Sequence, residues 1–113
     1  GDVRVRQAFA YCMDRAGLVQ KLFAGFGRVS TGFVMPEHPD FVAGLPAYPF
    51  DPQAGAALLD QAGWLDHDGD PTTPRQASGI PTVPNGTPLA SYRFYIRTAW
   101  EIMEREWAAV CGR

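Results

Sequence analysis

Residues 2–15 read DVRVRQAFAYCMDR, and this stretch decides how the chain begins to fold. Its apolar residues recur at the i, i+3, i+4 and i+7 positions that form one face of an α-helix. They are Val5, Ala8, Phe9, Cys12 and Met13. Asp2 stands at the N-cap position, where a carboxylate oxygen can accept hydrogen bonds from the free backbone amides of the first turn. The pattern therefore predicts an amphipathic helix whose apolar face packs on a core.

Two further helices are predicted by their start and stop signals. Asp14 is an N-cap for a short helix through Leu18 and Phe23 that closes at Gly25. Asp51-Pro52 places an N-cap aspartate before a proline at the first helical position, and this helix should end at Gly63. The residues of the third helix expected to face the core are Ala54, Ala57, Leu58 and Ala62.

The segments between these helices have a different composition. Residues 26–48 are rich in glycine, proline and aromatics, and the prolines exclude a regular helix, so we expect an extended connection with a short strand at Gly32 to Met35. Residues 65–88 are rich in Asp, Gly, Pro and Thr, and Asn85-Gly86 favours a turn there.

The spacing of the apolar residues changes in the last part of the chain, from the period of a strand to that of a helix. Residues 89–97 alternate as a strand does, with Tyr92, Phe94 and Ile96 on one face. A helical stripe follows, formed by Trp100, Met103, Trp107 and Cys111. The fold class predicted is therefore α+β, mostly helical with a short sheet, in a single domain over residues 1–113.

Composition limits the classes of function. The 113 residues are 46% hydrophobic and 19% charged, and 10 basic against 12 acidic residues give a formal net charge of -2. Nucleic-acid binding is not expected, because it needs a concentrated positive face. No apolar run reaches the roughly 20 residues that cross a bilayer, and no signal peptide opens the chain. The chain starts and stops abruptly beside helical sequence, so we expect an excised piece of a longer protein.

The two cysteines, Cys12 and Cys111, lie almost at opposite ends of the chain. Neither has a Cys or His neighbour at the spacing of a structural zinc site. Two buried thiols, a disulfide and a catalytic thiol all remain open on the sequence. A disulfide would close nearly the whole chain and would contribute about 4–5 kcal/mol in the chain-entropy view.

The acidic run at Asp66, Asp68 and Asp70 is the weak candidate for a Ca²⁺ site, because these residues have the first three ligand spacings of an EF-hand loop. Pro71 stands where that loop needs glycine, and Ala77 stands where it needs a bidentate glutamate. We therefore expect a solvated turn, with weak Ca²⁺ capture as the alternative.

No catalytic residues are predicted. His38 and His67 have no neighbouring partners that would make either a base or a metal ligand. The serines Ser30, Ser78 and Ser91 lack the G-x-S-x-G context of a nucleophile. The aromatics Phe9, Trp64, Trp100 and Trp107 are expected to belong to the core. A small hydrolase or metalloenzyme built on the two histidines and the acidic turn is the enzymatic alternative, and a free-standing interaction module is another.

The opening stretch resembles a signature segment of the family 5 extracellular solute-binding proteins, the oligopeptide- and dipeptide-binding subunits of ABC importers. That segment reads approximately V-R-x-A-h-x-x-A-h-D-R, where h is apolar. Val5-Arg6, Ala8 and Asp14-Arg15 match it, and Cys12 stands where the family usually has alanine.

Further motifs follow in the family's order. Residues 48–52 (YPFDP) resemble its Y-x-Y-D-P motif, and residues 56–64 resemble A-x-x-L-L-x-x-A-G-W. Residues 66–70 (DHDGD) and 85–89 (NGTPL) resemble its D-x-D-G-D and N-G-x-P-L motifs. Residues 72–82 are an insertion-like departure, to which no structure is assigned.

The resemblance implies part of the C-terminal lobe of a two-lobed, Venus-flytrap protein with the type II periplasmic-binding-protein fold. It implies an extracytoplasmic protein, in some members lipid-anchored, that passes peptides or similar solutes to an ABC permease. No enzyme activity, cofactor or resident metal is implied, and no ligand contact can be assigned to these residues. Asp14 and Arg15 would brace a helix joint. An oxidised Cys12–Cys111 pair is chemically permitted outside the cytoplasm. Surface that faces the remaining lobes in the whole protein can also favour dimerisation of a fragment.

Overall fold

The structure, a computed structural model, describes residues 1–32, 34–70, 72–89, 105 and 107–112. The elements are α1 (Val3–Cys12), α2 (Arg15–Phe23), α3 (Pro52–Gln61), β1 (Trp64–Leu65), β2 (Gln76–Ala77) and a π-helical turn, η1 (Ala108–Gly112). Helices with one small sheet agree with the α+β class predicted. In the described part of the chain, no helix has both the length and the apolar character needed to cross a membrane.

All three predicted helix starts are confirmed. Each is capped by its aspartate, whose side chain accepts a hydrogen bond from a backbone amide of the first turn. The bonds run from Arg4 N to Asp2 (2.8 Å), from Gly17 N to Asp14 (2.8 Å) and from Ala54 N to Asp51 (3.0 Å). α2 ends at Phe23 and is followed by its C-cap Ala24, whose φ of 48° is left-handed, and by Gly25 with a φ of 81°. The second helix therefore turns at the predicted place.

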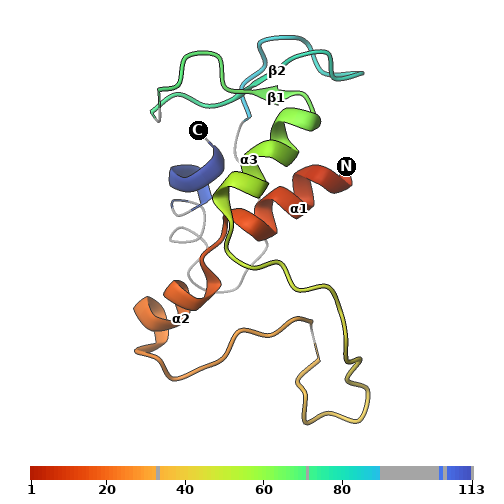
Figure 1. The fold of residues 1–113 in the computed structure, drawn as a ribbon, viewed down its shortest axis with the longest axis vertical. Helices are drawn as coiled ribbons and strands as arrows, with labels where there is room; N and C mark the ends of the chain where they lie inside the picture. The colour runs from red at the N-terminus through yellow and green to blue at the C-terminus, as the bar shows by residue number, and fades with distance from the viewer. Residues whose placement is uncertain (33, 71, 90–104, 106, 113) are drawn as a thin grey trace.

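The core lies where α1, α3 and η1 meet, as Figure 1 shows at the centre of the molecule. Its buried residues come from both ends of the chain: Val5, Ala8, Cys12, Leu59, Ala62, Leu89, Trp107 and Cys111. Phe9 stacks on Trp107, with 4.0 Å between the ring centroids and 9° between the planes. The apolar face predicted for the first helix is thus confirmed, and the residues that begin and end the chain pack together.

The face predicted for the third helix is confirmed at Ala62 and at Leu58, which packs against the core, but it was wrong at Ala57. Gly55, Leu59 and Ala62 are buried, whereas Ala57 is exposed and Ala54 and Leu58 are half-buried. The cause is the close approach of α3 to α1 at Gly55. A side chain there would stand 3.2 Å from the carbonyl oxygen of Ala8 and closer still to the sulfur of Cys12.

Cys12 and Cys111 form a disulfide in the structure; their Cα atoms are 5.8 Å apart, and the two residues are 99 positions apart in sequence. Both are fully buried. The bond joins the C-terminal end of α1 to η1 directly beneath Gly55 of α3. Three elements that are distant in sequence are therefore held at one point.

The small sheet lies at the C-terminal end of α3 and is drawn at the top of Figure 1. β1 and β2 pair antiparallel, with Trp64 opposite Ala77. β2 falls in residues 72–82, to which the sequence assigned no structure. Buried Arg75 fastens this sheet to α3, since its Nη1 donates to Asp60 (2.5 Å) and to the carbonyl of Trp64 (3.0 Å).

The predicted Asn85-Gly86 turn is confirmed beside β2. Asn85 accepts a hydrogen bond from Gly79 N (2.9 Å), and Gly86 N donates to the carbonyl of Ala77 (2.8 Å). The glycine has a φ of 80°, which favours a residue without a side chain. Leu89 then adds a hydrogen bond to Arg75 O (2.7 Å). The strand predicted over residues 89–97 lies, beyond Leu89, outside the described residues.

Two other predictions concern less regular segments. No strand forms at Gly32, Val34 or Met35, so the short strand expected there was wrong in the described residues. Among the described residues, Val34 and Met35 have no partner strand, and a lone strand cannot pair its backbone groups. Of the stripe predicted for the last helix, Trp107 and Cys111 are buried, whereas Trp100 and Met103 fall outside the described residues.

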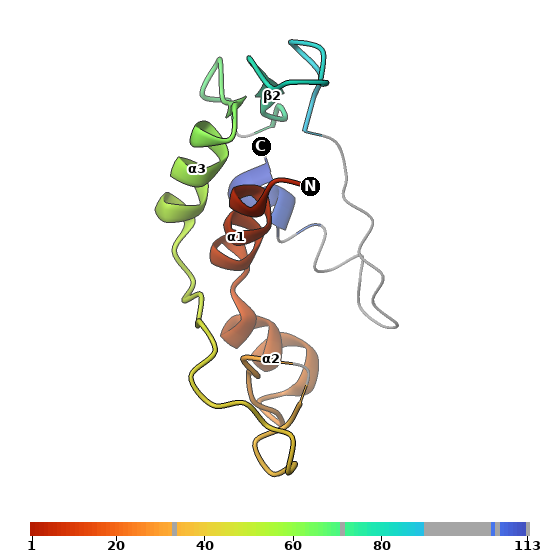
Figure 2. The same cartoon turned by 90° about the vertical axis from the view of Figure 1, so that its right-hand side faces the viewer.

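The molecule is elongated rather than round. Its extents are 46 × 27 × 24 Å and its radius of gyration is 15.5 Å, against the roughly 13 Å expected of a compact domain of this length. Figures 1 and 2 show the cause: α2 and the chain that follows it lie at the end opposite the sheet, away from α1 and α3.

Candidate functional site

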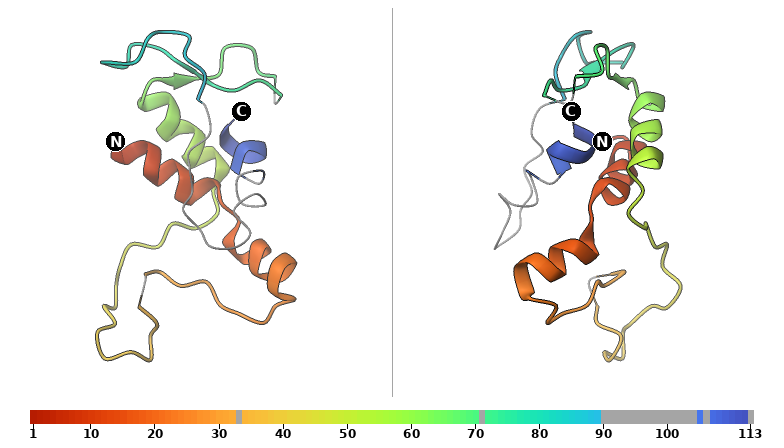
Figure 3. Two further views of the ribbon diagram at one scale, coloured as in Figure 1. Left: turned by 180° about the vertical axis from the view of Figure 1, so that it is seen from behind. Right: turned by 60° about the vertical axis from the view of Figure 1, so that its left-hand side comes forward.

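An open groove of about 760 Å³ runs along α1. Its apolar walls come from Val5 and Phe9 of α1, from Trp64 of β1 and from the loop Ile80–Val83. Figure 3 shows the N-terminal end of α1 and the region of the sheet from two further sides. A volume in this range suits a small molecule or a short stretch of polypeptide. Sequence reasoning did not find this groove.

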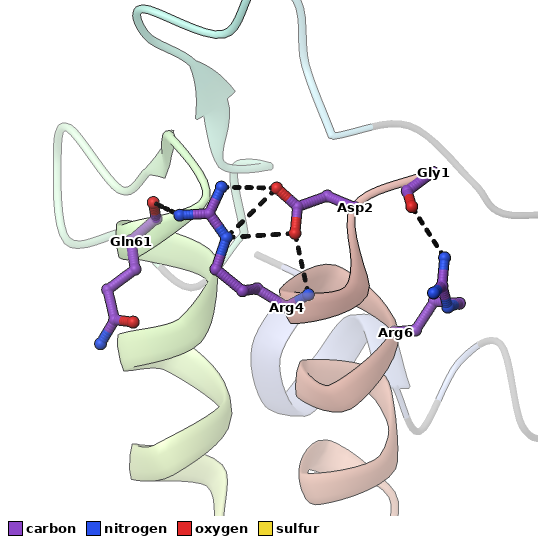
Figure 4. Close-up of polar contacts among 5 residues, drawn as sticks. All are labelled: Gly1, Asp2, Arg4, Arg6 and Gln61. Carbon is purple, nitrogen blue, oxygen red and sulfur yellow. Dashed lines mark hydrogen bonds and ion pairs between the residues drawn. The ribbon is translucent and has the colours of Figure 1, made fainter.

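The polar rim of the groove is built around Asp2. The Asp2 carboxylate pairs with the guanidinium of Arg4 at 2.5 Å, and Arg4 Nη1 donates to the carbonyl of Gln61 at 2.5 Å (Figure 4). Arg4 therefore links the start of α1 to the end of α3, where helix carbonyls have no partner of their own in the helix. Its role here is to join two helices.

Arg6, the arginine that lines the groove, points away from Arg4 and its partners. Arg6 Nη1 donates to the carbonyl of Gly1 at 2.7 Å, on the side of α1 away from Gln61 (Figure 4). Arg6 and Asp2 are the two charged residues among those that line the groove. The groove is therefore mainly an apolar surface with charges at one edge.

The Asp2 carboxylate should titrate at unusually low pH. The hydrogen bonds from Arg4 lower the pKa of Asp2 from 3.8 to about 2. A lowered folded-state pKa stabilises the fold above the unfolded value, and this contribution is lost as pH falls from about 4 through about 2. We expect an NMR titration of the Asp2 carboxyl to give a midpoint near 2.

The control for this titration is Arg4→Gln, which removes the charged partner and should return the Asp2 midpoint toward 3.8. Asp2→Asn should remove the part of the acid dependence of stability that falls in the same window. A midpoint close to 3.8 in the unaltered chain would contradict the ion pair.

The carboxylates of Asp66 and Asp68 in the acidic turn accept hydrogen bonds from backbone amides of the same turn. Asp66 accepts from Gly69 N (2.8 Å) and from Asp68 N (3.2 Å), and these bonds lower the pKa of Asp66. Asp68 accepts from Asp70 N (3.0 Å) and from the hydroxyl of Thr73 (2.9 Å). Within the described ranges, no three His, Cys, Asp or Glu side chains gather as a metal site would require.

The two histidines lie at the surface in different loops. His38 Nδ1 stands 3.6 Å from Asp40, and it accepts a hydrogen bond from Asp40 N at 3.2 Å. His67 is exposed in the acidic turn. Ser30 donates to the carbonyl of Gly32 (2.7 Å). Ser78 is half-buried beside β2, while Ser91 falls outside the described residues.

The joint between α1 and α2 was expected to be braced by Asp14 and Arg15, and Arg15 makes such a contact. Arg15 donates to the backbone carbonyl of Tyr48, and Asp51 N donates to the carbonyl of Tyr11 at 2.9 Å. Tyr11 and Tyr48 also meet edge to face, with 5.3 Å between centroids. The chain therefore leaves the core after α1 and returns to it at the same place.

Residues 1–108 match the bacterial extracellular solute-binding proteins, family 5 middle. One relative is a Brucella ovis protein named as an ABC transporter peptide-binding protein. It is 35% identical to this chain over 63 residues, which are 56% of the chain. The chain spans 12% of the length of that relative.

Two solved structures are similar to the chain. NikA from Brucella suis, in complex with Fe(III)-EDTA, is 26% identical with a TM-score of 0.76, over 96% of this chain and 21% of that one. The oligopeptide binding protein of Thermus thermophilus, complexed with a pentapeptide, is 31% identical with a TM-score of 0.59. That match covers 68% of this chain and 12% of the other.

Proposed function

The chain belongs to the bacterial extracellular solute-binding proteins of family 5, and from this we propose that it is part of the substrate-binding subunit of an ABC importer for peptides or related solutes. The observation that carries the proposal is the family match over residues 1–108. The peptide-binding relative and the pentapeptide-bound structure favour peptides as the solute. The family consists of binding proteins rather than enzymes.

Within such a subunit, we infer that these residues act as a structural wall of the C-terminal lobe of a type II fold. Their polar side chains support this role, because Arg4, Arg15 and Arg75 each bind a backbone carbonyl of a neighbouring segment. Side chains used in this way stabilise the packing of elements and do not converge on a ligand.

The proposed location is extracytoplasmic, at the cell surface or in the periplasm, with lipid anchoring of the whole protein as a further proposal. The Cys12–Cys111 disulfide supports it, since such bonds persist in oxidising compartments and are rare in the cytosol. The proposed partners are a peptide, the remaining lobes of the protein and an ABC permease.

Peptide binding tests the function directly. We expect the full-length protein, expressed from its complete reading frame, to bind di-, tri- or pentapeptides saturably in native mass spectrometry. The isolated 113-residue chain should show no saturable binding, because a Venus-flytrap protein encloses its ligand between two lobes and one wall cannot bury it.

The same peptide mixture should be applied to both proteins at equal concentration, with calorimetry on any peptide that binds. Saturable binding to the isolated chain would contradict the wall role. Failure of the full-length protein to bind any member of the peptide series would contradict peptides as its solute.

A further inference from the structure

Residues 24–47, which we term the arm, leave large apolar side chains in solvent. Phe26 is 87% exposed, Val42 61% and Met35 55%, and Val29 and Leu45 are also exposed. Single apolar residues on a surface need no explanation, but several on one short segment mark a surface that another part of a protein covers.

The backbone of the arm is also open. Between residues 28 and 47, leaving Phe33 aside, its backbone-to-backbone hydrogen bonds are two local turns, from His38 N to Met35 O (2.9 Å) and from Phe41 N to His38 O (3.0 Å). An extended segment with apolar side chains and few internal hydrogen bonds lacks the contacts that would hold its shape alone.

The arm has a shaped recess as well as an exposed surface. A hollow of about 310 Å³ is lined by Gly32, Val34, Phe41, Val42 and Leu45, among others. A Cβ at Gly32 would stand 3.0 Å from Leu45 Cδ1, so the glycine allows Leu45 to approach the backbone closely at this recess. The recess is large enough to receive an apolar side chain from a facing surface.

Charge argues for an apolar partner. The arm has three fully charged residues, Arg28, Glu37 and Asp40. Arg28 and Glu37 neutralise each other in an ion pair, which lowers the pKa of Glu37. No charge of one sign accumulates to attract an oppositely charged partner.

The comparison with NikA supports further polypeptide of the same protein as the covering surface. That structure matches 96% of this chain at a TM-score of 0.76, yet the matched part is 21% of its own chain. A similar fold therefore exists inside a protein in which most residues lie outside the matched region.

We propose that the arm docks, through Met35, Val42 and Leu45, on an apolar face formed by the part of the full-length polypeptide outside residues 1–113. The inference rests on the proposed function, in which this chain is part of a larger binding protein. The arm then links the core to the rest of the protein. Arg15 binds the carbonyl of Tyr48, where the arm returns to the core, and Met35, Val42 and Leu45 bind the rest of the protein.

Methionine oxidation tests this docking without any substitution. Met35 is 55% exposed and Met13 is 8% exposed, so Met13 is the internal control. In the isolated chain, dilute hydrogen peroxide should oxidise Met35 on the order of tenfold faster than Met13, as measured by peptide mass spectrometry. In the ligand-free full-length protein, the rate at Met35 should fall to that of Met13.

Equal reactivity of Met35 in both proteins would overturn the proposal. The isolated chain is measured at concentrations at which its Met35 rate no longer depends on concentration, so that self-association of the fragment does not protect Met35. A full-length protein that binds peptides but leaves Met35 reactive refutes the docking alone. One that protects Met35 but binds no solute supports the docking and refutes the function.

Val42→Asp gives an independent measurement. In the isolated chain this exposed substitution should leave the thermal midpoint unchanged, because it removes no buried contact. In the full-length protein it should lower the midpoint by several degrees, because it would place a charge in an apolar interface. Equal midpoint shifts in the two proteins would count against the docking.

Discussion

Reduction of the Cys12–Cys111 disulfide is expected to lower the free energy of unfolding of the chain by about 4–5 kcal/mol. The bond joins residues 99 apart in sequence, so it restricts nearly the whole unfolded chain, and the entropic effect grows with loop length. Domains of this size are stable by only about 5–15 kcal/mol. The reduced chain should therefore unfold at a much lower urea concentration than the oxidised chain.

Both cysteines are buried, so reduction should be carried out in urea and the chain refolded with reductant present. The paired variant Cys12→Ala with Cys111→Ala is the control. It loses the cross-link and the packing of both sulfurs, so it should be at least as destabilised as the reduced chain. If the oxidised and reduced chains share one urea midpoint, the bond has no part in stabilising this fold.

The helix starts could be predicted because their signals are local. Asp2, Asp14 and Asp51 each act within three residues of themselves, and the structure has all three as caps. A cap needs no knowledge of tertiary contacts, since the amides it binds belong to its own first turn. The same local chemistry explains the success at the Asn85-Gly86 turn.

The disulfide, by contrast, depends on tertiary structure. Nothing near Cys12 or Cys111 in sequence distinguishes a bridge from two buried thiols. What brings the sulfurs together is the packing of α1, α3 and η1 in one core, which joins residues from both ends of the chain. Periodicity predicts that both cysteines are buried, but it does not pair them.

The groove could not be predicted for a related reason. Val5 and Phe9 were recognised as one helix face, yet the opposite wall is the loop Ile80–Val83, which lies largely in residues 72–82, the insertion-like departure from the family's motifs. The small strand β2 in that stretch pairs with Trp64-Leu65 and so brings the loop to α1. A two-residue strand gives no detectable period.

The substitution Gly55→Ala is expected to destabilise the chain, against the usual trend for glycine within a helix. Replacing glycine by alanine in an exposed helix stabilises it by about 1 kcal/mol. At Gly55, however, the new Cβ would stand 2.2 Å from the Sγ of Cys12, 3.3 Å from the Sγ of Cys111 and 3.2 Å from the carbonyl oxygen of Ala8. We expect the net free energy of unfolding to fall by about 1–3 kcal/mol, as overpacking of a core does.

Ala57→Gly is the matched control for Gly55→Ala, because Ala57 is exposed on the same helix. It should lower stability by about 1 kcal/mol through helix propensity alone. Helix propensity alone thus predicts that Gly55→Ala raises stability and that Ala57→Gly lowers it. The contacts at Gly55 predict instead that both substitutions lower stability. A gain of stability in Gly55→Ala, measured by urea unfolding of the oxidised chain, would show that α3 does not lie against the disulfide.

The contact can also be assigned to particular atoms. In the background Cys12→Ala with Cys111→Ala, both sulfurs are absent, so that of the three atoms nearest to a residue-55 Cβ, Ala8 O at 3.2 Å remains. Gly55→Ala should then cost less than in the oxidised chain, or should even stabilise, because propensity acts against a smaller clash. Equal effects in the two backgrounds would mean that the clash is with the α1 backbone and not with the disulfide. A smaller loss of stability in the background without sulfurs would show that α3 packs directly on the disulfide. Gly55 would then be the residue whose missing side chain makes this close packing possible.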